Sequence, residues 1–502
     1  MLRTLILLVA LASMLRCTSD DIQEHPDIIL ILADDLGYGD PMCYNADSKI
    51  PTPSIDRLAL EGVRYTDAHT PSSVCTPTRY GVLTGRYAWR TALKKSVLWS
   101  WDRPLIAEER LTLPAMLKPM GYQTACIGKW HLGWRWPGKG ADTYVNDSLK
   151  IGDYDFVGRD DLHKEIDFNK TLDGGPVDRG FDYYFGDDVP NFPPYAFIEN
   201  NRLVAVPTVQ KPDSMFGRPG PMIDGWDLAK VIPTITEKAI AFIRQARQDR
   251  APFFLYLPLN APHTPIAPAE KFRNQSEAGA YGDFVCQVDD IVRQVYEAVH
   301  EVESGRETLI IFTSDNGSPQ RDGTNMSGKI GSIKNFGHDP SKPWRGLKAD
   351  IWEGGHRVPL IIHWPGQISP NGVNTDPFCL TDIMPSIAGI LNIDLPKSAA
   401  EDGLDLSRQW IHSDEKSAQR THLIHHAIDG TFAVRKGPWK LIAGQDSGGF
   451  SKNLPEENVS VSTPGQLYNL DRDPGERNNL YTQQPTIVKE LDELLKQVTI
   501  LK

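Results

Sequence analysis

Four short runs of consecutive apolar residues lie next to polar, charged or glycine residues. They comprise residues 27–33, 253–257, 308–314 and 359–363. Apolar runs without alternation are typical of strands that are buried on both faces of a sheet. The first run leads into Asp34-Asp35, the second leads to His263, and the third leads into Asp315-Asn316. The runs therefore predict strands of a mostly parallel sheet, with polar side chains at their carboxyl ends.

Segments with helical periodicity lie between these runs. Residues 234–247 and 284–299 carry apolar side chains at spacings of three and four, as expected of helices with one buried face. A shorter helix is expected over residues 55–60, with Ser54 as a candidate N-cap. Strands that alternate with helices predict an α/β fold in which helices cover both faces of the sheet. Ligands of such folds bind at the carboxyl ends of the strands.

The pattern changes near residue 400. Short predicted strands cover residues 421–427, 431–436 and 439–442, and an amphipathic helix covers residues 487–498. We therefore predict two domains, an α/β catalytic domain over residues 20–400 and a smaller α+β domain over residues 401–502. A chain of 502 residues is long enough to form two such cores.

Residues 1–19 are predicted to be a signal peptide. Arg3 provides a positive start, residues 5–15 are largely apolar, and Ala10 and Ala12 offer small side chains near a cleavage site. The apolar run is too short to cross a bilayer, and no later stretch approaches the ~20 apolar residues that a membrane helix requires. A secreted or periplasmic protein is expected. Lipid attachment at Cys17 is disfavoured because Arg16 precedes it.

Charge and cysteine content narrow the possible functions. The formal net charge is −12, and no basic run is interleaved with aromatic residues, which argues against binding to nucleic acids. Without Cys17, five cysteines remain, so at least one thiol of an exported chain is unpaired. No Cys/His spacing typical of zinc sites occurs. The five cysteines are Cys43, Cys75, Cys126, Cys286 and Cys379.

The most specific motif is Cys75-Thr76-Pro77-Thr78-Arg79, which continues to Leu83-Thr84-Gly85-Arg86. This twelve-residue string resembles the signature of the type I sulfatases, a family of the alkaline phosphatase superfamily. The resemblance implies an alkaline phosphatase-like fold. It also implies that a maturation enzyme oxidises Cys75 to formylglycine.

The local chemistry agrees with this interpretation. Pro77 suits the first turn of a helix, which places Cys75 at the helix N-terminus, where free N–H groups favour an anion. Arg79 follows one turn later on the same side.

The acidic pairs are candidate metal ligands. Carboxylate and amide oxygens suit Ca²⁺ or Mg²⁺, and six or more oxygen ligands favour Ca²⁺. Their surroundings, Ala33-Asp34-Asp35-Leu36-Gly37 and Ser314-Asp315-Asn316-Gly317, resemble the metal-binding segments of the sulfatases. The resemblance implies that the four residues and the modified Cys75 together hold Ca²⁺, with Mg²⁺ as the alternative.

Three further segments resemble catalytic elements of the same family. In Gly128-Lys129-Trp130-His131, the resemblance assigns Lys129 to the hydrated aldehyde (gem-diol) of formylglycine and His131 to removal of a proton from it. In Ala261-Pro262-His263, it places His263 on the sulfate ester. In Arg345-Gly346-Leu347-Lys348, it assigns Lys348 to the sulfate group. Either His263 or Lys348 can protonate the leaving alcohol, and we favour His263 because histidine titrates near neutral pH.

The sequence therefore predicts a sulfatase whose gem-diol nucleophile hydrolyses O-sulfate esters on a carbohydrate. The overall pattern is most similar to arylsulfatases and N-acetylgalactosamine-6-sulfatases. One alternative is a phosphate or phosphonate ester hydrolase of the same superfamily, and another is a non-catalytic glycan-binding protein if Cys75 is not matured. Aromatic residues over 99–101 and 191–195 form either a sugar-stacking rim or ordinary packing contacts.

Overall fold

The computed structural model describes residues 25–152, 159–411, 419–454 and 462–500. The expected signal peptide and Cys17 lie outside these ranges. Among the described residues, no helix combines the length and the apolar character that a membrane crossing needs.

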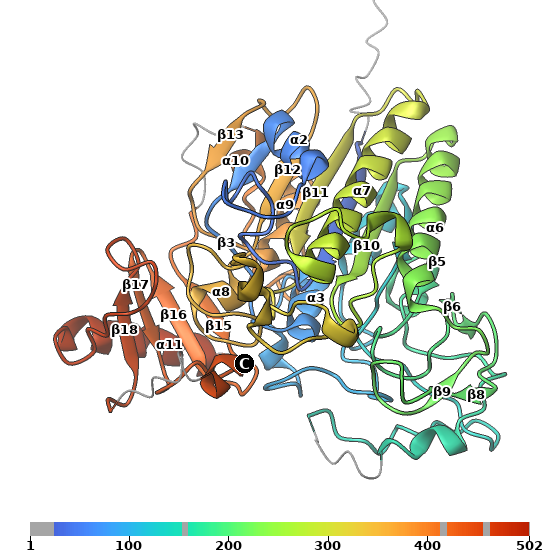
Figure 1. The fold of residues 1–502 in the computed structure, drawn as a ribbon. Helices are drawn as coiled ribbons and strands as arrows, with labels where there is room; N and C mark the ends of the chain where they lie inside the picture. The colour runs from blue at the N-terminus through green and yellow to red at the C-terminus, as the bar shows by residue number, and fades with distance from the viewer. Residues whose placement is uncertain (1–24, 153–158, 412–418, 455–461, 501–502) are drawn as a thin grey trace, which may run out of the picture.

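A ten-stranded sheet forms the centre of the molecule, in the order β13-β2-β12-β11-β1-β10-β4-β5-β6-β7 (Figure 1). Strand β1 pairs in parallel with β10 and β11, and β4 pairs in parallel with β10 and β5. Strand β12 runs antiparallel to β11 and β2. The strands are β1 (Asp27–Asp34), β2 (Val63–Tyr65), β4 (Gln123–Ile127), β5 (Tyr183–Gly186), β6 (Ile198–Glu199), β7 (Arg202–Leu203), β10 (Phe253–Pro262), β11 (Thr308–Ser314), β12 (Leu360–His363) and β13 (Gly372–Asn374). Two short pairs lie outside it, β3 (Ala68–His69) with β14 (Phe378–Cys379) and β8 (Val209–Gln210) with β9 (Pro221–Met222).

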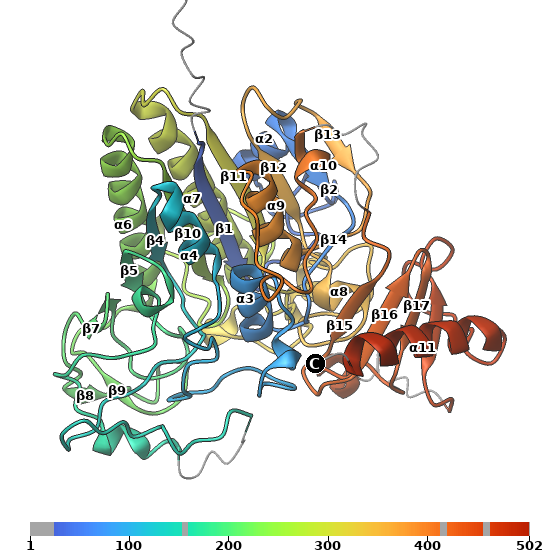
Figure 2. The same cartoon turned by 180° about the vertical axis from the view of Figure 1, so that it is seen from behind.

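Helices cover both faces of this sheet, as Figures 1 and 2 show from opposite sides. Along β1, Ile29 and Ile31 pack into the core beneath α2 (Pro53–Glu61), α6 (Leu228–Gln248) and α7 (Gly279–Glu301). Leu30 and Leu32 pack into the opposite core with α3 (Cys75–Thr84), α4 (Leu113–Leu117) and α9 (Ile383–Ile390). The central strands β1, β10, β11 and β12 are thus buried throughout, which explains the uninterrupted apolar runs and confirms the predicted α/β class.

The expected N-cap at Ser54 is wrong. Helix α2 begins at Pro53, and Thr52 occupies the N-cap position. Proline suits the first position of a helix because its missing N–H would have no partner there. The first free N–H groups are satisfied from another helix instead, since Asp289 of α7 accepts hydrogen bonds from Ser54 N at 2.9 Å and Ile55 N at 2.8 Å.

A small antiparallel sheet follows the main domain, in the order β15 (Leu423–His426), β16 (Phe432–Lys436), β17 (Trp439–Ile442) and β18 (Gln466–Asn469). Helix α11 (Pro485–Ile500) packs on β16 and β17 (Figure 2). This confirms a smaller C-terminal α+β unit. Helix α10 (Ser407–Ile411) still packs against α9, with Trp410 in the main core. The domain boundary at residue 400 stays a prediction.

Candidate active site

The ends of three neighbouring strands bring the predicted acidic residues together. Asp34 ends β1, Asp315 follows β11, and both are fully buried. The backbone N–H of Asp35 donates to Asp315 Oδ1 at 3.2 Å, and Asn316 Nδ2 donates to Asp35 Oδ1 at 2.7 Å. His263 follows β10, and its Nε2 lies 3.7 Å from Asp35 Oδ2. The parallel sheet therefore gathers residues from positions 34 to 316 at one edge.

Helix α3 begins at Cys75 and directs its N-terminal end into the same site. Val74, the N-cap, has an extended backbone and a side chain that accepts no hydrogen bond, so the first N–H groups of the helix remain available. Arg79 donates from Nε and Nη2 to Asp315 Oδ2, at 3.0 and 2.8 Å. Burial raises the pKa of the Cys75 thiol. The charges of Lys129 and Lys348 oppose this rise, and those of Asp315 and Asp34 add to it.

Two lysines complete the charged lining of the site. Lys129 Nζ lies 2.7 Å from Asp34 Oδ2, and Lys348 Nζ lies 2.7 Å from Asp35 Oδ1. Burial would raise the pKa of Asp34, but the nearby cations, Lys129 foremost, hold it well below its usual value. Burial would likewise lower the pKa of Lys348, but Asp35 raises it. The carboxylate of Asp34 and the ammonium group of Lys348 therefore both carry their charge at neutral pH.

The two predicted histidines differ in their surroundings. His131 Nε2 lies 2.9 Å from the carbonyl of Leu98, so its Nδ1 is available as an acceptor; this atom is buried and has no hydrogen-bond partner among the described residues. Burial and the charge of Lys129 hold the pKa of His131 well below its usual value. Burial and the charge of Lys348 lower the pKa of His263 to about 4. Both imidazoles are neutral at pH 7.

The oxygen donors fit a hard divalent cation. One ligand atom from each of Asp34, Asp35 and His263 lies within 4.8 Å of the others. Asp34 Oδ1 and Asn316 Oδ1 are buried and accept no hydrogen bond within the described ranges. Buried polar oxygens are normally satisfied, so two unsatisfied ones in a single acidic cluster are the expected trace of a metal ligand set.

Sequence reasoning missed a second acidic pair, Asp187-Asp188, which follows β5 at the same edge. The backbone N–H of His131 lies 3.2 Å from Asp188 Oδ1, and Asn260 Nδ2 donates to Asp187 Oδ1 at 2.7 Å. Burial raises the pKa of Asp187 to about 6 and that of Asp188 to about 7. The pair holds the segment that carries Lys129 and His131. The rule that selected Asp34-Asp35, acidic residues at the end of a strand, would have found it.

The aromatic residues over 99–101 and 191–195 include both buried packing residues and a pair that lies beside the candidate site. Trp101 and Tyr195 are buried, with 1% and 2% of their surface exposed, so they are packing residues. Trp99 is only half-buried and stacks on Phe192, with ring centroids 5.4 Å apart. Phe192 also meets the ring of His131 edge-on at 6.3 Å. This stacked pair therefore borders His131, one of the residues that the motifs selected.

Comparison with known proteins points to one family. A family model described as Sulfatase matches residues 26–393. The chain is 32% identical to an N-acetylgalactosamine-6-O-sulfatase of Bacteroides thetaiotaomicron, over 95% of this chain and 93% of the relative. It is 31% identical to human arylsulfatase A, over 99% of this chain and 90% of the relative.

Solved structures agree with these relatives. A structure from work on the metabolism of multiple glycosaminoglycans by Bacteroides thetaiotaomicron matches with a TM-score of 0.79 and 30% identity, over 95% of this chain and 100% of that one. The PsFucS1 sulfatase from Pseudoalteromonas sp. matches with a TM-score of 0.72 and 26% identity, over 97% and 93% of the two chains. The similarity therefore extends over both the main sheet and the small C-terminal sheet.

Proposed function

This chain belongs to the sulfatase family, whose members hydrolyse sulfate esters, and from that premise we propose that it removes O-sulfate groups from a carbohydrate by means of a formylglycine at position 75 and a bound Ca²⁺. The proposal depends above all on one observation. The first residue of α3, three strand ends and two lysines converge on a single buried site. The carbohydrate substrate is supported by the relative that is an N-acetylgalactosamine-6-O-sulfatase.

In this proposal Asp34, Asp35, Asp315 and Asn316 hold the cation, for which Mg²⁺ is the alternative. Formylglycine, once hydrated, supplies an oxygen nucleophile for attack on sulfur, and the cation supplies positive charge that favours its ionised form. Arg79 fixes Asp315 through two contacts and adds positive charge beside the reacting oxygens. Lys129, which also pairs with Asp34, is proposed to bind the hydrated aldehyde at position 75.

His131 is proposed to remove the proton that must leave position 75 when sulfate is released. Its Nδ1 is unprotonated and without a protein partner in the described residues, so it can accept that proton. A general base needs such a free lone pair within the site.

The proton for the leaving alcohol has two candidate sources. The preference for His263 depended on an ordinary histidine pKa, and burial lowers that pKa to about 4. Lys348 is protonated at neutral pH, because Asp35 raises its pKa. We therefore propose Lys348 as a proton donor for the leaving alcohol on an equal footing with His263. A Lys348→Met variant that retains full activity on esters of poorly acidic alcohols would leave His263 as the donor.

The experiment that tests the function compares Cys75→Ala with Cys286→Ala, because both cysteines are buried and free. Purified wild type and variants are assayed for sulfate release from N-acetylgalactosamine 6-sulfate and from a nitrophenyl sulfate. Cys75→Ala is expected to abolish release, and Cys286→Ala to keep it. Appreciable turnover by Cys75→Ala would refute the role of position 75. Peptide mass spectrometry of the wild type should also show residue 75 lighter than a thiol, as an aldehyde would be.

Parallel assays with nitrophenyl phosphate and phosphonate esters address the related hydrolases of the superfamily. A higher kcat/KM for either of these than for the sulfate would replace the sulfatase proposal. Export remains part of the proposal, with residues 1–19 as the signal peptide. N-terminal sequencing of the protein from its host would locate the cleavage site.

A further inference from the structure

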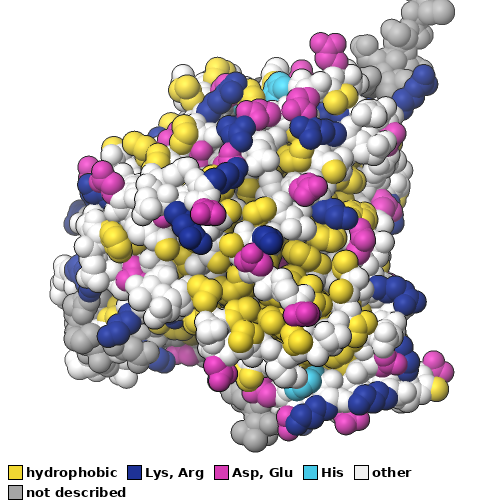
Figure 3. Space-filling view, turned by 45° about the vertical axis from the view of Figure 1, so that its right-hand side comes forward, with side chains coloured by type: hydrophobic (Ala, Val, Ile, Leu, Met, Phe, Trp, Pro, Cys, Tyr) yellow, Lys and Arg dark blue, Asp and Glu magenta, His cyan; other side chains and the backbone are white. Residues whose placement is uncertain are grey.

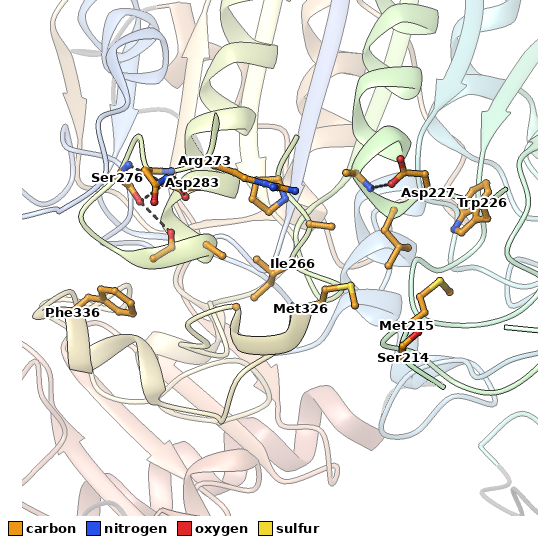
Figure 4. Close-up of a pocket in the computed structure, with 18 of the residues that line it drawn as sticks. Ser214, Met215, Trp226, Asp227, Ile266, Arg273, Ser276, Asp283, Met326 and Phe336 are labelled. Atoms are coloured by element: carbon orange, nitrogen blue, oxygen red, sulfur yellow. Dashed lines mark hydrogen bonds between the residues drawn. The ribbon is translucent and has the colours of Figure 1, made fainter. Parts of the chain in front are cut away.

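A groove of about 810 Å³ lies beside the proposed catalytic centre, between the N-terminal ends of α6 and α7 (Figure 4). Its walls are largely apolar and are contributed by Trp226, Ile266, Met326, Met215 and Phe336. We call it the lateral groove. Figure 3 shows a face of the molecule on which many apolar side chains reach the surface. Phe336 is a clear example, with 45% of its surface exposed.

The lateral groove is continuous in the chain with the catalytic centre. Ile266 follows His263 by three residues, and its backbone N–H donates to the carbonyl of Met326 at 2.7 Å. Ala280 lines the groove, and the hydroxyl of the adjacent Tyr281 lies 3.2 Å from the carbonyl oxygen of Asp35. Two walls of the groove are thus formed by residues close in the chain to His263 and to the tyrosine that contacts Asp35.

The acidic side chains of the lateral groove are already engaged. Asp283 accepts hydrogen bonds from Asn274 N at 2.8 Å and from Ser276 N and Oγ at 3.0 Å. Asp227 caps α6 by accepting from Ala229 N at 3.0 Å. Glu277 lies 3.6 Å from the ammonium group of Lys49. Asp283 and Asp227 thus have partners within the protein, whereas the Glu277 side chain is 80% exposed and its contact with Lys49 is a weak surface ion pair.

Arg273 is different. It is exposed, and its guanidinium points toward the middle of the groove, between Asp283 and Asp227 in Figure 4. No carboxylate pairs with it within the described parts of the chain. Arg273 is thus the one cationic side chain among the described residues that line the groove, and its guanidinium is well suited to bind a carboxylate or a sulfate through two parallel hydrogen bonds.

We propose that the lateral groove binds the sugar residue next to the sulfated one, and that Arg273 binds an acidic group on that residue. The inference depends on the proposed function, because the neighbouring sugar can reach the groove only if the sulfated sugar is bound in the catalytic centre. Apolar walls with one charged group are typical of small-ligand sites, and the volume of the groove falls within their range of ~300–1,000 Å³. The acidic group is a carboxylate or a second sulfate.

Binding calorimetry on Cys75→Ala protein tests the proposal without depending on sulfate release. Three disaccharides are compared, in which the sulfated N-acetylgalactosamine is linked to a uronic acid, to a sulfated hexose or to a neutral hexose. The parent is expected to bind an acidic disaccharide about tenfold more tightly than the neutral one, the effect of one charge-assisted hydrogen-bond pair. Adding Arg273→Gln is expected to reduce this ratio to about one.

Two matched controls accompany these variants. Lys271→Gln removes a nearby cation that pairs outside the groove with Asp290, at 3.1 Å, and should leave the ratio unchanged. Ala229→Trp fills the groove and should weaken both kinds of disaccharide relative to the sulfated monosaccharide, whereas Lys230→Trp, the exposed neighbour, should not.

An unchanged ratio in Arg273→Gln would overturn the proposal, as would equal affinity of Ala229→Trp and parent for the disaccharides. Tighter binding of a long-chain alkyl sulfate than of any disaccharide, insensitive to Arg273→Gln, would also overturn it. Selective binding of acidic disaccharides together with no sulfate release by the wild type would instead refute the proposed function alone.

Discussion

Replacing Lys440 with methionine should destabilise the protein and disturb its active site together. Lys440 lies on β17 with none of its side chain exposed, and its ammonium group is 3.0 Å from Glu353 Oε1 and 2.9 Å from Glu476 Oε1. Glu353 belongs to α8 (Glu353–His356), five residues after Lys348. This buried cluster therefore joins the small sheet to the segment that carries a proposed sulfate-binding lysine.

Removing one partner of a buried ion pair costs about 3–5 kcal/mol, because the other charge is left without compensation. Glu353 retains Arg357 at 2.9 Å, but Glu476 loses its cation. An unfolding entropy of about 2.1 cal/mol/K per residue gives about 1 kcal/mol per degree for this chain, so Tm should fall by about 3–5 °C. Calorimetry and kcat/KM are measured on the same samples. Lys436→Met is the control, since Lys436 and its partner Glu490 are both at least half exposed.

The loss should also depend on pH. Burial raises the pKa of Glu476 to about 7 from an ordinary value of 4.5, while Lys440 opposes that rise. A raised carboxyl pKa contributes stability that is complete below the unfolded pKa and is lost as the pH rises through the folded pKa. Without Lys440 the ionised form keeps the hydrogen bond from the backbone N–H of Glu353, at 2.7 Å, but loses the ammonium group, so the Tm difference from the wild type should grow between pH 5 and pH 8. A fall in Tm below 1 °C, or a difference that shrinks as the pH rises, would refute this reasoning.

Three further outcomes are expected. Arg79→Lys should lower kcat/KM by about 100-fold, because one ammonium group cannot replace the Nε and Nη2 contacts to Asp315. Steady-state kinetics measure this, and a kcat/KM above a third of the wild-type value would contradict it. Dialysis against a chelator should abolish sulfate release and lower Tm, and added Ca²⁺ should restore both; unchanged Tm and activity would exclude a structural and catalytic cation. Asp289→Ala should cost about 1–2 kcal/mol in urea unfolding by removing the acceptor of two N–H groups of α2, and an unchanged urea midpoint would contradict this.

The central fold followed from sequence because its physical cause is local. A strand buried on both faces needs an uninterrupted apolar run, and β1, β10, β11 and β12 each have one. The direction of β12 and its pairing with β2 depend on which strands meet in space, and no local pattern records that. The same holds for the cap of α2, whose acceptor, Asp289, lies 234 residues from Ile55 along the chain.

The candidate site divides in the same way. Residues inside specific motifs, such as Cys75 and Lys129, could be selected individually, and the structure brings them together. A buried cluster of His69, His356 and His425, with ligand atoms within 4.8 Å of one another, escaped notice because its members are far apart in the chain and each lies in an unremarkable segment. Its rings stack and pair with one another, with His356 and His425 centroids 3.9 Å apart. Such clusters become visible only when the two domains are seen packed.

The charges of the site explain why a cation is needed there. Asp34, Asp35 and Asp315 face Arg79, Lys129 and Lys348, so three carboxyl groups oppose three cations, and both histidines are neutral. Burial and the charge of Asp34 raise the pKa of Asp315 to about 7, so the side chains leave the site close to neutral. A sulfate monoester carries one negative charge, and an ionised nucleophile adds a second. A buried site that is neutral by itself would disfavour both. The two positive charges of a divalent cation match this requirement. A neutral site of this kind should therefore bind sulfate esters weakly after chelation, even though every positively charged side chain remains in place.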